Sequence, residues 1–132
     1  MLYGVQRHGS NIMTYKIIIP GELTDLNTYI KAERTNKHIA AKIKKNDTET
    51  VRLLSRLMPK VEKQIIVKII WYTKDSKKDP DNVAFAKKFI LDGLVLSKVL
   101  KNDGRKQIKA FEDCFEVDKL NPRIEVELIE VE

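Results

Sequence analysis

The stretch VEKQIIVKIIWYT, residues 61–73, is the part of the sequence that decides the fold. Every second side chain from 65 onward is apolar, in the set Ile65, Val67, Ile69 and Trp71, which continues the alternation begun at Val61. The positions between them add Ile66, Ile70 and Tyr72. Apolar residues at both sets of positions predict a central β-strand that is covered on each side.

Segments on either side of this strand predict the other elements. Strands are expected at residues 15–20, 107–111 and 123–131, and helices at 26–45 and 83–96. Asn46-Asp47-Thr48 is expected to interrupt the first helix and to cap a short segment that stops at Pro59. The order β-α-β-α-β-β predicts one small α/β (α+β) domain over residues 13–132, with a mixed sheet of about four strands and two to three helices. Residues 1–12 lack periodicity and are expected to be a flexible leader.

Length and composition exclude several classes of protein. A chain of 132 residues with 42% hydrophobic and 33% charged residues fits a single globular domain. No apolar run approaches the roughly 18 residues of a membrane helix, and no secretory signal is recognisable, so a cytoplasmic protein without membrane contact is expected. One cysteine, Cys114, rules out an intrachain disulfide, and two histidines argue against a closed zinc site.

The charge of the chain is unevenly distributed. The net charge is +6, and residues 1–60 alone hold 11 Lys and Arg against 5 Asp and Glu. Residues 74–109 hold 10 basic and 5 acidic residues, whereas residues 112–132 hold 2 and 8. This distribution favours a polyanion-binding face, although a lysine-rich solvated surface would give the same numbers. The residues expected to contact DNA are Lys31, Arg34, Lys37, Lys42, Lys44, Lys45, Lys77, Lys78, Arg105 and Lys106.

The tetrapeptide DPDN, residues 79–82, is the strongest candidate for a site. Asp79 precedes a proline and is expected to be extended, and in an extended segment Asp79 and Asp81 project to the same side. Two carboxylates at the start of a helix suit Mg²⁺, which water and substrate phosphate would complete. Asp is also a preferred N-cap, so Asp81 could instead serve only the helix start.

Two more charged residues follow along the expected helix. Lys88 and Asp92 lie seven and eleven residues after Asp81, on nearly one line at about 100° per residue. Lys88 could stabilise charge on a phosphate, or it could simply be solvated. Asp103 could bring a third carboxylate to the site, but Asn102-Asp103-Gly104 reads equally well as an ordinary turn.

Taken together, residues 79–107 resemble the RusA family of Holliday junction resolvases. Members of that family carry a D-x-D-N motif at the start of a helix, then a lysine and an aspartate along that helix, and a D-D or N-D pair before a strand. The resemblance implies that Asp79, Asp81 and Asp103 are metal-binding catalytic aspartates, with Asn82 as the motif asparagine and Asp92 in support. Lys88 matches the catalytic lysine when the alignment is anchored on Asp92; Lys87 is the alternative.

The resemblance further implies a homodimer that binds four-way DNA junctions and nicks two strands symmetrically with Mg²⁺ or Mn²⁺. It also implies a bacterial, phage or prophage origin. Two alternatives stay open, namely a DNA-binding protein of the same fold that lacks activity and a nuclease with another preference, such as flaps or single strands.

Overall fold

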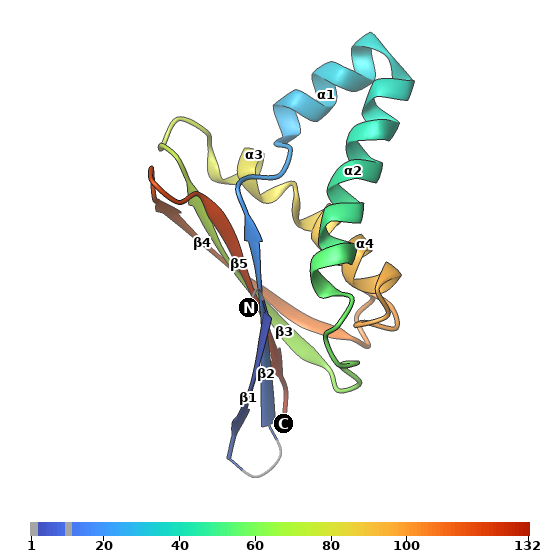
Figure 1. The fold of residues 1–132 in the computed structure, drawn as a ribbon, viewed down its shortest axis with the longest axis vertical. Helices are drawn as coiled ribbons and strands as arrows, with labels where there is room; N and C mark the ends of the chain where they lie inside the picture. The colour runs from blue at the N-terminus through green and yellow to red at the C-terminus, as the bar shows by residue number, and fades with distance from the viewer. Residues whose placement is uncertain (1–2, 10–11) are drawn as a thin grey trace.

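Strand β3, Ile65–Thr73, lies inside a five-stranded mixed sheet in this computed structural model, which describes residues 3–9 and 12–132 (Figure 1). One neighbour is β5, Arg123–Glu130, which runs antiparallel, and the other is β4, Ile108–Val117, which runs parallel and forms one edge. β2, Ile12–Pro20, pairs with the far side of β5. The expected small α/β domain with a mixed sheet is confirmed, with one strand more than predicted.

The additional strand is β1, Tyr3–His8, which pairs antiparallel with β2 and forms the second edge of the sheet. The expectation of a flexible leader over residues 1–12 is therefore not met where the chain is described. Met1, Leu2, Ser10 and Asn11 lie outside the described residues. Pairing with β2 supplies the order that the sequence of this segment does not indicate.

The helices lie on one face of the sheet (Figure 1). On that face Ile65, Val67, Ile69 and Trp71 of β3 are at most 1% exposed. The alternate residues Ile66, Ile70 and Tyr72 are only half-buried. The prediction that β3 is covered on each side is therefore wrong for this chain by itself. Its second face is shielded by neighbouring side chains of the sheet instead, among them Arg123, whose guanidinium lies 3.8 Å from the centroid of the Tyr72 ring.

Helices α1, Leu26–Thr35, and α2, Lys37–Ser55, meet at Asn36, whose side chain accepts a hydrogen bond from the N–H of His38. The predicted break at residues 46–48 is wrong, because α2 runs through it. Asp47 accepts a hydrogen bond from the N–H of Thr24, and Thr48 is buried. Tertiary contacts thus outweigh the weak helix propensity of this stretch.

The single helix expected at residues 83–96 is two helices, α3, Pro80–Ala84, and α4, Lys87–Leu96. Between them Phe85 packs against Tyr29 and Phe89, with ring centroids 5.3 and 5.5 Å apart, and this aromatic cluster joins the turn to α1. α4 packs closely on α2 at Gly93, where an added Cβ would lie 2.5 Å from Cβ of Val51.

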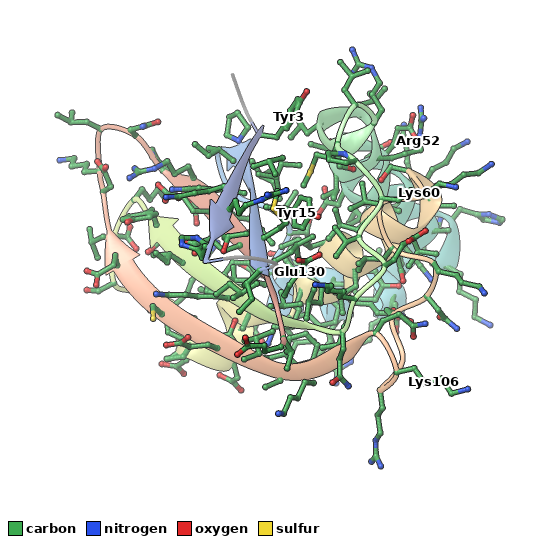
Figure 2. All side chains as sticks on the ribbon, turned by 90° about the horizontal axis from the view of Figure 1, so that it is seen from below. Tyr3, Tyr15, Arg52, Lys60, Lys106 and Glu130 are labelled. Atoms are coloured by element: carbon green, nitrogen blue, oxygen red, sulfur yellow. The ribbon has the colours of Figure 1, made fainter. Side chains whose placement is uncertain are left out.

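A buried polar contact joins strands β2 and β5. The Tyr15 hydroxyl donates to a carboxylate oxygen of Glu130 over 3.3 Å, and both side chains are buried where β2 meets β5 (Figure 2). Within residues 3–9 and 12–132, none of the helices is long and apolar enough to cross a membrane.

Candidate active site

The start of α3 holds the two motif aspartates. Asp79 is the N-cap residue, with φ −67° and ψ 153°, and is extended as predicted for a residue before proline. Asp81 lies in the first helical turn, so the interpretation of Asp81 as the cap is wrong. The geometric argument that both residues are extended also fails, since only Asp79 is. The two carboxylates therefore come from the cap and first turn of one helix.

Both aspartate side chains are exposed and unpaired. Asp79 makes no capping hydrogen bond, and neither carboxylate has a hydrogen bond or ion pair with any described residue. Most acidic side chains on the rest of the sheet and helices have such partners, as Glu125 does with Lys16 and Arg123. Two unpaired carboxylates on one short helix are available to an external cation.

A second group of charges lies at the start of α4. The Lys88 ammonium is 3.0 Å from Asp92 and 3.7 Å from Asp103. The predicted common face for Lys88 and Asp92 is confirmed, and Asp103 joins them from a loop. The pKa of Lys88 is raised, chiefly by its hydrogen bond to Asp92, with a smaller contribution from the charge of Asp103. Lys88 is therefore positively charged at neutral pH.

The two groups do not merge into one cluster of ligands. The turn at Phe85 and Ala86 interrupts the helical line on which Asp81, Lys88 and Asp92 were expected, so that part of the prediction is wrong. Nowhere in the described chain do three or more His, Cys, Asp or Glu side chains gather closely enough to hold a metal ion. Asp79 and Asp81 nevertheless fit Mg²⁺, because that ion often takes only one or two protein carboxylates and fills its remaining positions with water and phosphate oxygens.

Lys87 has different surroundings from Lys88, although the two are adjacent in sequence. Its ammonium lies 2.6 Å from Oδ2 of Asp113 on β4 and 4.4 Å from the centroid of the Phe111 ring. The indole N–H of Trp71 donates to Oδ1 of the same aspartate over 2.9 Å. Lys87 is therefore partly buried and paired within the fold. Of the two lysines, Lys88 is the one that contacts a predicted site aspartate.

Asn82 has a positioning role. It is buried, and its side-chain oxygen accepts a hydrogen bond from the N–H of Asn27 over 2.9 Å. The neighbouring Asp25 caps α1 by accepting from the N–H of Thr28 over 2.7 Å. Asn82 thus ties the start of the basic helix α1 to the acidic helix α3.

Lys78 belongs to the same support. Its ammonium is 2.8 Å from Asp25 and 4.0 Å from Glu22, and the hydrogen bond to Asp25 is the main reason its pKa is raised. Its partners are therefore carboxylates of this chain, which weakens the expectation that Lys78 contacts DNA.

The other residues expected to contact DNA are exposed. Those of α1 and α2 lie on the pair of helices that projects from the sheet beside α3 (Figure 1). Lys77 is in the loop before α3, and Arg105 and Lys106 are in the loop before β4, where Lys106 extends away from the body of the protein (Figure 2). The α1–α2 residues are Lys31, Arg34, Lys37, Lys42, Lys44 and Lys45.

Comparison of the chain with protein-family models and with curated proteins finds no match.

The site region includes contacts that the sequence did not indicate, made by Trp71, Phe111 and Asp113. Their proximity depends on the parallel pairing of β3 with β4, which brings together residues about 40 positions apart.

Proposed function

We propose that the protein is a Mg²⁺-dependent endodeoxyribonuclease that resolves four-way DNA junctions by paired, symmetric nicks, and that Mn²⁺ can replace Mg²⁺. The observation that carries this proposal is the pair of exposed, unpaired carboxylates of Asp79 and Asp81 next to a strongly basic pair of helices. Carboxylates repel phosphate unless a cation lies between them. Their presence beside a polyanion-binding surface is therefore best explained by a bound divalent ion.

The basic helices supply affinity. α1 and α2 present exposed Lys and Arg residues, which would bind phosphates and release counterions from DNA. Asn82 fixes the start of α1 against α3, so the phosphate-binding surface and the aspartates keep a constant relation. This link lets binding of the DNA backbone bring one phosphodiester to Asp79 and Asp81.

The chemistry is phosphodiester hydrolysis. The divalent ion, when bound, polarises a phosphoryl oxygen and lowers the pKa of a water molecule. Asp79 and Asp81 would hold that ion. The resemblance to the RusA family makes Asp103 a third ligand, and to reach the ion Asp103 would have to leave its ion pair with Lys88. Lys88, which stays protonated, would stabilise the negative charge that develops on the phosphate, and Asp92 orients its ammonium.

A homodimer suits this substrate, because a two-fold axis would present two equivalent sites to two equivalent strands of a junction. The protein would act on DNA in the cytoplasm of a bacterium. Its gene would belong to the bacterium, to a prophage or to a phage. The resemblance of residues 79–107 to the RusA family supports both statements.

A cleavage assay on a synthetic four-way junction tests the proposal. The wild-type protein is expected to give paired nicks with Mg²⁺ or Mn²⁺ and none with EDTA. The D81N variant is expected to bind the junction at least as tightly as wild type, because a negative charge near the phosphate is removed, but not to cut it. Folded wild-type protein that binds junctions and cuts none with any divalent ion would overturn the proposal.

A DNA-binding protein without activity is the second candidate. It is favoured by one observation, that Asp103 is paired with Lys88 rather than gathered with Asp79 and Asp81 in the part of the chain that is described. The same assay separates the two candidates, since this one predicts binding with no metal-dependent product.

A further inference from the structure

A groove of about 580 Å³ lies beyond the end of α4. It is formed by the segment that leads from α2 to β3, residues 56–64, and by the segment that leads from α4 to β4, residues 97–107. The N–H of Val61 donates to the carbonyl of Val99 over 2.8 Å and joins the two segments. These two residues and Leu100 give the groove an apolar floor, since they line it and are at most 4% exposed.

Three lysines line this groove, namely Lys60, Lys98 and Lys101, and all three are exposed. Their ammonium groups have no ion pair or hydrogen bond with any described residue. Glu62 is the single acidic side chain among the described residues that line the groove. The groove therefore has an excess of positive charge that its own lining does not neutralise.

The whole end of the molecule around the groove has the same sign of charge, and Figure 2 shows the protein from this end. Residues 56–64 and 97–107 together hold 7 Lys and Arg against 2 Asp and Glu. One of these two acidic residues, Asp103, is paired with Lys88. Glu132, two residues after β5, adds one carboxylate near the start of β3. These carboxylates are too few to reverse the positive charge.

Lys98 has a backbone conformation that usually belongs to glycine. Its φ is 66°, and within residues 3–9 and 12–132 no other residue except glycine has a positive φ. The N–H of Lys98 donates to the carbonyl of Val95, and the N–H of Val99 donates to the carbonyl of Leu94, which are the hydrogen bonds of a Schellman motif at the end of α4. A side chain at this position adds backbone strain that glycine avoids. A ligand bound by the Lys98 ammonium would account for a lysine here.

The groove is continuous with the basic surface of α2. Val95 lines it and also lines a second groove, between α2 and α4, which Lys44 and Lys45 border. The acidic residues of that second groove, Glu49 and Asp92, are each paired with a basic residue of the same helix. A path of unpaired lysines therefore runs from α2 past the end of α4.

This path suits an extended polyanion better than a single small anion. Lysines bind the phosphates of a nucleic acid backbone, and the apolar floor between them can contact its sugars. The loop that carries Lys101 also carries Asp103, which contacts Lys88 at 3.7 Å. The groove therefore adjoins the charges that the proposed function assigns to the cut phosphodiester.

We propose that Lys60, Lys98 and Lys101 bind backbone phosphates of a double-stranded arm of the DNA, outside the phosphodiester that is cut. This inference rests on the proposed function and adds a second binding site for the same substrate. Contacts to phosphates are independent of base sequence, so the groove would hold an arm of any sequence.

Binding of a fluorescent four-way junction in EDTA, measured by anisotropy at several NaCl concentrations, tests the groove without cleavage. The triple variant K60Q/K98Q/K101Q is expected to bind more weakly. The slope of log Kd against log salt concentration is expected to fall by about 3, because each phosphate contact contributes about 1 to that slope.

A variant with the same loss of charge elsewhere is the matched control. R7Q/K68Q/K119Q removes three positive charges from β1, from β3 and from the loop after β4, none of which lines the groove. Its slope is expected to change by no more than about 1. The difference between the two triple variants measures local contacts, because their net charges are equal.

K98G separates binding from folding at one position. Glycine fits the positive φ, so this variant is expected to be at least as stable as wild type in urea. The slope of its salt dependence is nevertheless expected to fall by about 1. A K98G protein that is less stable than wild type and binds the junction equally well would show that Lys98 serves only the end of α4.

A folded K60Q/K98Q/K101Q protein with the salt dependence of the control would overturn the inference. So would a change from dimer to monomer in this variant alone, measured by analytical ultracentrifugation, since the lysines would then bind acidic residues of a second copy. Junction cleavage by wild type distinguishes the two proposals. Cleavage together with an unchanged slope in the groove variant rejects only the groove, whereas a reduced slope without wild-type cleavage rejects only the nuclease.

Discussion

Helices α3 and α4 are separated by only two residues, yet they carry their charges in opposite ways. On α3, Asp79 and Asp81 are exposed and have no partner among the described residues. On α4, Lys87 and Lys88 each have carboxylate partners, and Phe89, Ile90 and Leu94 are buried in the core. The turn at Phe85 and Ala86 separates the exposed carboxylates at the start of α3 from the buried side chains of α4, on which the core depends.

This difference indicates which residues can be substituted to change activity without changing the stability of the fold. Exposed, unpaired carboxylates contribute little to folding, and under the proposed function these two hold a divalent ion. The α4 side chains have structural partners that explain them. Substitutions of Asp79 and Asp81 should therefore change activity, and substitutions of the buried residues of α4 should change stability. Lys88, whose charge is proposed to act on the phosphate, lies on α4 but belongs with the aspartates.

The largest effect is expected from D79N and D81N. Each removes a proposed ion ligand, so junction cleavage with Mg²⁺ is expected to fall by about 100-fold or more. The free energy of unfolding, measured with urea, is expected to change by no more than about 0.5 kcal/mol because both side chains are exposed. Glu112→Gln, an exposed residue on the other face of β4, is the control for loss of one negative charge. If D81N failed to fold, Asp81 would be shown to stabilise the start of the helix instead of holding an ion.

G93A is expected to have the opposite profile. Its Cβ would lie 2.5 Å from Cβ of Val51 and 2.9 Å from the carbonyl oxygen of Thr48, too close for the packing of α2 on α4. We expect a loss of stability of about 1–3 kcal/mol, measured by urea denaturation. Cleavage per folded molecule should stay near that of wild type. A G93A protein as stable as wild type would show that α2 and α4 pack less closely than described.

Replacing each of the two adjacent lysines by alanine tests the comparison where α4 begins. K87A removes the partner of Asp113 in a largely buried contact and is expected to lower stability by about 1–2 kcal/mol. K88A loses mainly exposed ion pairs, worth about 0–1 kcal/mol, but its cleavage rate is expected to fall about 10- to 100-fold. Single-turnover cleavage and urea denaturation of both variants check this. The reverse assignment would make Lys87 the residue that acts on phosphate.

The smallest effect concerns pH. Because the folded-state pKa of Lys88 is raised, its ion pairs contribute fully below the ordinary pKa of lysine and are lost only as pH rises through the higher folded value. The ratio of wild-type to K88A cleavage rates is therefore expected to be constant from about pH 7 to 9. A ratio that falls within this range would mean that Lys88 loses its proton near neutral pH and does not act as a fixed positive charge.

Local patterns were sufficient to predict much of the fold. The alternation around Ile65 to Trp71 located β3, and the proline after Asp79 predicted the extended backbone of that residue. The helix that follows begins at Pro80, three residues before the predicted start. Features that depend on distant contacts could not be predicted, such as the continuation of α2 through Asp47 or the ordering of β1 by β2. In the site, the pairing of Lys88 with Asp92 follows from helical spacing.

The partners of Lys87 and of Asn82 required the tertiary structure. Asp113 reaches Lys87 from a parallel strand 26 residues later in the chain, and Asn27 reaches Asn82 from 55 residues earlier. No periodicity in the sequence relates such positions. The turn at Phe85 also involves a distant residue, because the ring of Phe85 contacts that of Tyr29.

Localised binding of Mn²⁺ is the most direct test of the claim that Asp79 and Asp81 hold a divalent ion. Paramagnetic Mn²⁺, titrated into isotope-labelled protein, broadens the amide resonances of residues close to the bound ion. Selective broadening of the amide resonances of residue 79 and of residues 81–84 is predicted for wild type, and its loss is predicted for the D79N/D81N double variant. Broadening that is uniform, or centred elsewhere on the chain, would contradict the account.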